Sequence, residues 1–250
     1  MNVLSISEIH FRRFVFKAKD SFLTNALNTK ASINYFIQCP INFRNQLNEF
    51  YTLLIDLKMP LDAIWNNIYH RAQTEINSFE NNQIYEYKII SQISSKELAL
   101  FISMFNGFAK HKNIRLAEAF RIKAYNQNGI LTISYIKQDG KFICVNIYRL
   151  TAERATNLYS FHLKHELENC YNSSHFGRAH RCLHWLDIKE FKKAGINYYD
   201  FCGWYAGLED KALLNINAFK EQFTSYKVLE YSGVIYNNVF LNFYKKFRNG

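Results

Sequence analysis

The chain of 250 residues has few of the residues that interrupt or cross-link a fold. It contains only 2 prolines and 9 glycines, which argues against long linkers, collagen-like repeats and disorder. Its 5 cysteines are scattered and odd in number, without a CxxC pair or a Cys/His metal spacing, which favours a reducing, cytoplasmic compartment and predicts no bound metal. At 48% hydrophobic and 17% aromatic residues, a folded chain of one large or two small domains is expected.

Long hydrophobic runs are also missing. No apolar stretch reaches the roughly 18 residues that a membrane-spanning helix needs. The first residues, MNVLSISEIHFRRF, do not follow the basic-then-apolar order of a secretory signal. The sequence therefore predicts a cytoplasmic protein without a membrane span, and it leaves the oligomeric state open.

Acidic residues are in the minority, and the formal net charge is +10. An excess of this size favours anionic partners such as nucleotides, coenzyme A, nucleic acid or acidic membrane surfaces. The basic residues form no run of five or more, so a solvated basic surface without a specific partner is an equal alternative.

The first part of the chain mixes strand-like and helical patterns. Strands are predicted over His10–Lys17, Ser32–Cys39 and Ile84–Ile90, the last because tyrosine and aliphatic residues alternate. Helices are predicted over Phe43–Leu57 and over Leu61–Phe79, which Pro60 opens.

The second part begins with a helix that Ser94 or Ser95 caps. Asp139-Gly140 is a strong hairpin signal between two strands. Further helices are predicted over Leu116–Tyr125, Ala179–Ala194 and Leu213–Phe223, and strands over Gly129–Ile136, Lys141–Leu150, Ala155–Leu163, Ile196–Cys202, Lys227–Tyr236 and Val239–Phe247, with Asn237-Asn238 as the last turn.

The segment from Gly177 to Gly207 reads as a loop, a helix and a short aromatic strand. Unpaired N–H groups at a helix start suit phosphate oxygens. Gly177 would let the backbone approach closely, and Arg178, His180 and Arg181 would add positive charge. The alternative is an ordinary helix entry that Ser173 or Ser174 helps to cap.

This order of elements resembles the GNAT acyltransferase superfamily, and within it the FemABX-like branch of peptidyltransferase-type proteins. Residues 195–203, GINYYDFCG, are similar to that branch's "G…YDF.G", and 219–223, FKEQF, followed by Tyr231-Ser232-Gly233, to its "FK..F…G". The helix LDAIWNNIYHRAQTEI resembles the branch's Arg-bearing helix. The resemblance implies an α/β (α+β) fold with a GNAT-like, mixed, mostly antiparallel sheet flanked by helices. It also implies two GNAT-like domains, a degenerate one over residues 1–94 and an acyltransferase domain over 95–250.

The activity that the resemblance implies is N-acyl transfer. Short proteins of this type acylate an amino group on a nucleotide-linked sugar with acyl-CoA, a step in cell-surface polysaccharide biosynthesis. The cofactor expected is acyl-CoA, as co-substrate, and the acceptor an anionic amino-sugar nucleotide. Because the chain lacks a heptad-rich arm, a nucleic-acid partner is expected only in the alternative of an aminoacyl-tRNA-dependent peptidyltransferase. A non-catalytic GNAT-like interaction module is the third possibility.

The chemistry needs a neutral amine and donors for the tetrahedral oxyanion. In a GNAT arrangement the third strand splays from the strand after the helix, which implies acyl contacts near Phe161, His162 and Leu163. The resemblance places the pyrophosphate at the helix start, with Ser173, Gly177, Arg178, Ala179 and His180. Direct attack in a ternary complex is expected, because the sequence shows no convincing nucleophile motif.

Asp200 and His175 are the candidate catalytic residues, and Trp204 and Tyr205 the candidate substrate-binding pair. Asp200 would hold or deprotonate the amine, although it could equally cap the turn that follows. His175 is better placed to relay a proton than His184, which reads as surface or core. Trp204 and Tyr205 could stack on a base or sugar, or simply pack. Cys182 falls on the apolar helix face and is expected to be core. His162, His165 and Glu166 have a metal-like spacing but no further ligand, so zinc is not expected.

Overall fold

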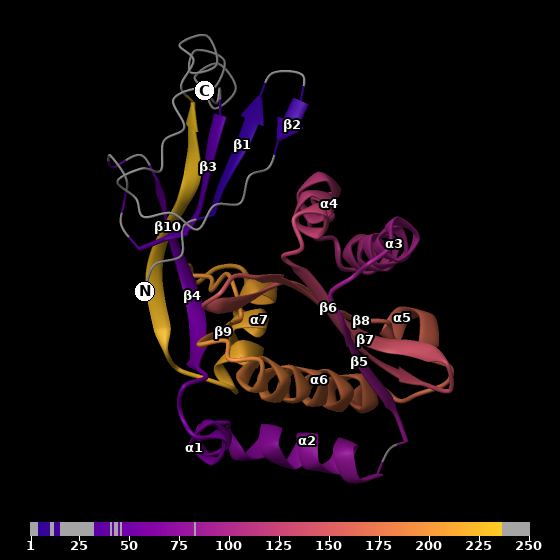
Figure 1. The fold of residues 1–250 in the computed structure, drawn as a ribbon. Coiled ribbons are helices and arrows are strands. Elements are labelled where there is room, and N and C mark those ends of the chain that lie inside the picture. Colours follow the sequence, from indigo (N-terminus) through magenta and orange to yellow (C-terminus); the bar gives the residue numbers. More distant parts are fainter. Residues whose placement is uncertain are drawn as a thin grey trace. The chain divides into compact units, whose positions relative to one another are not determined.

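The computed structural model describes residues 5–10, 13–15, 33–40, 42, 45, 47–82 and 84–236 (Figure 1). The chain divides into two compact units. Unit 1 contains residues 1–52 and 227–250, and unit 2 contains residues 53–226.

Unit 1 is an antiparallel sheet. Its strands are β1 (Ser5–His10), β2 (Arg13–Val15), β3 (Ile33–Cys39) and β10 (Lys227–Tyr236). They run in the order β2-β1-β3-β10. The bounds of β10 are those predicted. The predicted strand Val239–Phe247 and the turn before it lie outside the described residues.

Unit 2 is built on a mixed sheet in the order β4-β9-β8-β7-β6-β5. The strands are β4 (Asn48–Asp56), which continues from unit 1, β5 (Glu86–Ile90), β6 (Leu131–Gln138), β7 (Lys141–Leu150), β8 (Arg154–His162) and β9 (Tyr198–Asp200). Neighbouring strands are antiparallel except β8 and β9, which are parallel. The predicted mixed, mostly antiparallel sheet flanked by helices is confirmed.

Helices cover both faces of this sheet (Figure 1). One face carries α6 (Ser173–Lys193), with α1 (Leu61–Asn66) and α2 (His70–Asn82) packed on it. The other face carries α3 (Ser95–Lys112) and α4 (Ala119–Gln127). The remaining helices are α5 (Lys164–Leu167) and α7 (Lys211–Glu221). In the described part of the chain, no helix has both the length and the hydropathy required to cross a membrane.

Local signals explain several of these elements. Ser94 accepts from Glu97 N–H while the Glu97 carboxylate accepts from Ser94 N–H, a complete capping box at the start of α3. Asp139 and Gly140 both have positive φ, at 49° and 73°, as the hairpin between β6 and β7 requires. Ile196 N–H donates to Phe191 C=O beyond Gly195, whose φ is 78°, so α6 ends in a Schellman motif.

Three predicted elements were wrong in kind or extent. Phe43–Leu57 was predicted as a helix, but residues 48–56 form β4, because this segment pairs with β9 and tertiary pairing overrides the helical spacing of its leucines. Leu61–Phe79 is two helices, because Tyr69 N–H donates to Gln222 C=O instead of continuing the helix. Helix α6 begins at Ser173, six residues before the predicted start, because Asn172 Oδ1 caps it through His175 N–H.

The predicted domain boundary, 94/95, falls inside unit 2, between β5 and α3. Strand β5 pairs with β6 along its whole length, and α2 packs against α6, so both belong with the second part of the chain. That residues 1–94 form a degenerate GNAT-like domain stays a prediction.

Candidate functional site

Strands β8 and β9 separate within unit 2. They pair only through Arg154–Thr156 and Tyr198–Asp200, and β8 then continues to His162 paired with β7 but not with β9. One edge of β8 is therefore open over its second half. This is the splay that the GNAT resemblance implies.

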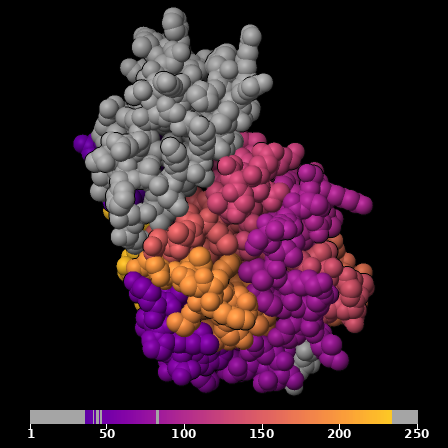
Figure 2. Space-filling model, in the orientation of Figure 1, coloured from indigo at the N-terminus to yellow at the C-terminus, as the bar shows by residue number. Residues whose placement is uncertain are grey.

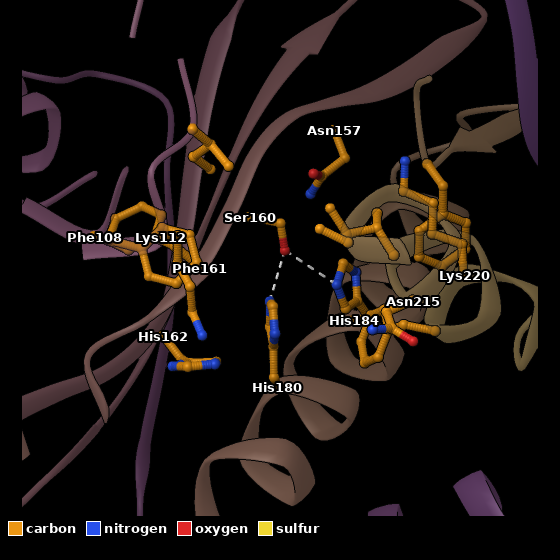
Figure 3. Close-up of a pocket in the computed structure, with 15 residues that line it drawn as sticks. Phe108, Lys112, Asn157, Ser160, Phe161, His162, His180, His184, Asn215 and Lys220 are labelled. Atoms are coloured by element: carbon orange, nitrogen blue, oxygen red, sulfur yellow. Dashed lines mark hydrogen bonds between the residues drawn. The ribbon is translucent and has the colours of Figure 1, made fainter. Parts of the chain in front are cut away.

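A cavity of about 410 Å³ lies at this open edge (Figure 3). Its size is in the range of small-molecule sites. Apart from Ile114, which follows α3, and Phe201, which follows β9, its walls come from four elements: β8, α6, and the facing helices α3 and α7. In Figure 2 the side chains of the α7 region, in orange, adjoin the purple ones of α3. The lining residues are Phe108, Lys112, Ile114, Asn157, Ser160, Phe161, His162, His180, His184, Phe201, Ala212, Asn215, Ile216, Phe219 and Lys220.

Backbone donors face the cavity from β8. Leu163 N–H donates to Ile143 C=O on β7, and N–H groups alternate between the two edges of a strand. The N–H groups of Ser160 and His162 consequently point to the opposite edge, which β9 leaves open. A bulge at Leu158, where Tyr148 is opposite Asn157 and Ile147 is opposite Tyr159, changes the direction of β8 just before these donors.

Asn157 offers a further donor. Its side chain is 6% exposed, and its Nδ2 has no hydrogen-bond partner among the described residues. Figure 3 shows this amide directed toward the middle of the cavity. A buried amide without a partner has a free-energy cost, and a ligand oxygen in the cavity would remove it.

Two histidines one turn apart on α6 meet Ser160 of β8. The Ser160 Oγ lies 2.6 Å from His180 Nε2 and 3.2 Å from His184 Nε2 (Figure 3). It also donates to Asn146 Oδ1 over 2.6 Å. That amide oxygen can only accept, so Ser160 commits its one proton to it and His180 Nε2–H must be the donor to Ser160. A serine held in this way is an acceptor for histidine and not an activated nucleophile.

Behind these histidines, Asp187 is 0% exposed and accepts four hydrogen bonds. Tyr87 donates to Oδ1 over 3.0 Å; Ser134, Asn146 and Tyr148 donate to Oδ2 over 2.7, 2.9 and 2.6 Å. Burial raises the pKa of Asp187 to about 6 despite these bonds. The four donors come from β5, β6 and β7, so the carboxylate ties three strands to α6.

Burial also sets the charge of the pocket histidines. It lowers the pKa of His184 to about 3 and that of His162 to about 4, and it lowers the pKa of His180 well below its usual value. All three rings are neutral at pH 7, and a neutral imidazole can accept a proton. Lys220 Nζ donates to the carbonyl oxygens of Cys202 and Gly203, both over 2.5 Å, and so places its positive charge beside these two carbonyl groups.

The structure brings some predicted residues together here and not others. Phe161, His162 and His180 line the cavity. Leu163 is buried, and its N–H is committed to Ile143, so it is not a donor to the cavity.

The predicted phosphate loop is displaced by the earlier start of α6. Gly177 lies in the second turn, where its N–H is within the helix ladder, so the first-turn residues Ser173 and Ser174 carry the unpaired N–H groups instead. Lys164 Nζ donates to Ser173 Oγ over 2.9 Å. Arg178 is partly exposed, and Ala179 is buried in the core.

The predicted catalytic and substrate-binding residues lie outside the cavity lining. Asp200 is 0% exposed and pairs with Arg154 at 3.2 Å. His175 Nε2 contacts Gln138 Oε1 at 2.5 Å, and its ring stacks on Tyr171. Trp204 Nε1 donates to Glu221, and Tyr205 N–H donates to Asn217; both bonds hold the segment after β9 to α7.

Cys182 and Cys202 lie in surroundings that keep their thiols protonated. Burial raises the pKa of Cys182 to about 12 and that of Cys202 to about 11, so both are thiols at neutral pH and weak nucleophiles. Within the described ranges, no three His, Cys, Asp or Glu side chains gather as a metal site would require.

Sequence reasoning missed Asp187, Tyr148 and Tyr199, and it assigned His184 to surface or core. A signal was present on α6: His180, His184 and Asp187 are spaced i, i+4 and i+7 and so share one helix face. The strand partners of Asp187 carry no such signal, because alternation alone does not show which face of a sheet α6 covers.

Comparison with known proteins supports the fold and no narrower family. No family model and no curated protein sequence matches the chain. Among solved structures, FemX matches over 78% of this chain and 63% of its own, with 10% identity and a TM-score of 0.58. A conserved protein of unknown function from Bacteroides thetaiotaomicron matches over 76% of this chain and 62% of its own, with 12% identity and a TM-score of 0.53. The chain thus has a FemX-like fold and spans less than two thirds of the length of either protein.

Proposed function

We propose that the protein is an N-acyltransferase that passes an acyl group from acyl-CoA to the amine of a small acceptor by direct attack in a ternary complex. The observation that supports this most is the cavity at the open edge of β8. There the N–H groups of Ser160 and His162 and the amide of Asn157 face the same space as two neutral histidines. Donors for a carbonyl oxygen and a base for an amine proton are the two requirements of the reaction.

The surroundings of the candidate nucleophiles support direct transfer. Ser160 donates its proton to Asn146, and the raised pKa values of Cys182 and Cys202 keep both thiols protonated. An acyl-enzyme would need one of these groups to be activated.

The acceptor we propose is an amino sugar linked to a nucleotide. The net charge of +10 and Lys112 at the cavity suit an anionic ligand. The donor phosphates would lie near the start of α6, beside Lys164 and Ser173. The FemX-like fold favours one other donor, an aminoacyl-tRNA, whose binding would weaken steeply with salt.

The test is a transfer assay with CoA thioesters and amino-sugar nucleotides, with mass spectrometry of the product and the intact protein. We expect an acylated amine, no acyl adduct on the protein, and loss of turnover in His184→Gln. The matched control is His70→Gln on the exposed surface of α2, which should leave turnover unchanged. Salt-sensitive binding of tRNA without binding of CoA would instead support the aminoacyl donor, and binding of neither would indicate an interaction module.

A further inference from the structure

A continuous row of hydrogen bonds connects the cavity wall to the buried Asp187. His184 Nδ1 lies 2.5 Å from Tyr199 Oη, Tyr199 Oη lies 2.7 Å from Tyr148 Oη, and Tyr148 Oη lies 2.6 Å from Asp187 Oδ2. All four side chains are at most 1% exposed. We call His184, Tyr199, Tyr148 and Asp187 the relay.

The number of protons in the relay fixes the direction of each bond. When Asp187 is ionised, Tyr148 must donate to it, Tyr199 must donate to Tyr148, and His184 Nδ1–H must donate to Tyr199. The proton of the neutral imidazole is then on Nδ1. The lone pair is on Nε2, at the cavity wall. In this form the 3.2 Å contact between Nε2 and Ser160 Oγ is not a hydrogen bond, because the Ser160 proton goes to Asn146, and Nε2 is left to accept a proton from a ligand.

We propose that this relay is the base of the reaction, with His184 Nε2 receiving the proton at the cavity and Asp187 storing it. The inference rests on the proposed function. The amine nitrogen bonds to the acyl carbon, and its proton goes to His184 Nε2. The Nδ1 proton moves to Tyr199, the Tyr199 proton to Tyr148, and the Tyr148 proton to Asp187 Oδ2. When the C–S bond breaks, the reverse shift returns one proton to the leaving thiolate, so the protein ends unchanged.

The arrangement explains how His184, a poor base because its pKa is low, can still accept a proton from the amine. Burial among the rings of Phe201, Phe219 and Phe223 opposes an imidazolium at His184. After the shift the charge on both residues is removed, because the imidazole is neutral again and the carboxylate is protonated. The pKa of Asp187, raised to about 6, makes it the better place for that proton than His184, whose pKa burial lowers to about 3.

Other titratable groups around the relay do not compete for its proton. Tyr87, Cys144 and Cys182 act on Asp187, and burial raises the pKa of each, so they stay neutral. His180, Arg181 and Lys220 act on His184: the first is neutral, and the positive charges of the other two further lower its pKa.

The first experiment reads the relay without any reaction. In ¹⁵N-histidine NMR of the full chain at pH 8, we expect His184, assigned by His184→Gln, in the Nδ1–H form. In Tyr199→Phe the ring loses its acceptor, and the Nε2–H form that donates to Ser160 should dominate. Tyr148→Phe breaks the next link and should also change the population if Tyr199→Phe does not fold. The control Tyr87→Phe removes a bond to the same carboxylate outside the relay and should keep Nδ1–H.

Acidification is the second readout. Protonation of Asp187 reverses every bond, so His184 should change from Nδ1–H to Nε2–H near pH 6 while staying neutral, and Asp187→Asn should abolish this change. An Nε2–H form in the wild type at pH 8, or a form that is indifferent to Tyr199→Phe and Tyr148→Phe, would overturn the proposal.

The third readout is turnover. Tyr199→Phe should lower kcat by roughly 100-fold or more with KM unchanged, in the range for removal of a general base. The kcat of the double variant Tyr199→Phe/Asp187→Asn should be no lower than that of the slower single variant. The kcat of Tyr87→Phe should stay near that of the wild type. Absence of any acyl transfer would reject the proposed function while the NMR result stands; the NMR change with unaltered kcat in Tyr199→Phe would reject the relay as the base.

Discussion

At the scale of single residues, Asp200 is a buried carboxylate with contacts on both of its oxygens. It is 0% exposed, and its Oδ2 lies 3.2 Å from both Arg154 Nη1 and Thr156 Oγ1, while Oδ1 accepts from Cys202 N–H over 2.7 Å. These contacts fix the end of β9, and Asp200 is not among the residues that line the cavity.

We therefore expect Asp200→Asn to act on stability. It removes the negative charge 3.2 Å from the buried Arg154 guanidinium, and breaking a buried ion pair typically costs roughly 3 kcal/mol. Urea unfolding should show this loss, whereas the exposed capping variant Asp210→Asn should lose far less. If Asp200→Asn keeps its stability and loses turnover, the carboxylate is catalytic after all.

Asn157 is the opposite case, a buried side chain whose Nδ2 has no hydrogen-bond partner among the described residues. Asn157→Leu keeps the number of side-chain heavy atoms, removes the amide and can extend into the cavity, so the free energy of unfolding should stay the same or rise. Under the proposed function it also removes a donor to the ligand, and the dissociation constant of the CoA thioester should increase about tenfold, for a bond worth about 1.5 kcal/mol. Thermal shifts with and without the thioester measure both effects; lower stability with unchanged affinity would show a structural amide.

At the scale of elements, α6 carries two glycines in different conformations. Gly177 is inside the helix, where a Cβ would meet only Arg181 Nη1, at 3.2 Å. Gly195 follows the helix with a φ of 78° and open space around it, a backbone conformation that costs a side chain about 1 kcal/mol.

We expect Gly177→Ala to raise the free energy of unfolding by about 0.5 kcal/mol and Gly195→Ala to lower it by about 1 kcal/mol. Chemical denaturation of the two variants beside the wild type measures both. A large loss in Gly177→Ala would mean that the helix needs this glycine for a close approach, as the sequence alone indicated.

At the scale of the whole molecule, the histidines couple stability to pH. Burial lowers the pKa values of His162, His175, His180 and His184. Below pH 6.5 the unfolded chain binds protons that the folded chain does not, so stability falls as pH decreases from about 6.5 toward 4. Asp187 has the opposite sign: its raised pKa makes the folded chain bind a proton between about pH 6 and 4 that the unfolded chain releases.

Four histidines outweigh one carboxyl, so the melting temperature should decrease from pH 7 to pH 4.5. His184→Gln should flatten this dependence, since one buried neutral histidine contributes a slope of up to about 1.4 kcal/mol per pH unit. Asp187→Asn should steepen it. Calorimetry across this range provides the measurement, and a wild-type melting temperature that is constant or rises on acidification would contradict the assigned charges.

The sequence by itself determined what local chemistry controls. Asp139-Gly140 specified a hairpin, the two serines at 94 and 95 specified the start of α3, and the predicted bounds of β7 and β10, which were placed beside turn signals, are confirmed. The order of elements, together with the motifs at residues 195–203 and 219–223, predicted a FemX-like fold, which the solved structures support. For the hairpin and the start of α3, the stabilising contact lies within a few residues along the chain.

Only the tertiary structure decided the rest. The segment 48–56 became a strand because β9 supplied hydrogen bonds from about 145 residues away, which local spacing does not encode. The relay has the same origin, since His184 and Asp187 come from α6, Tyr148 from β7 and Tyr199 from β9. A site made of side chains that are distant in sequence exists only when packing brings them together, and burial then sets the pKa values on which its chemistry depends.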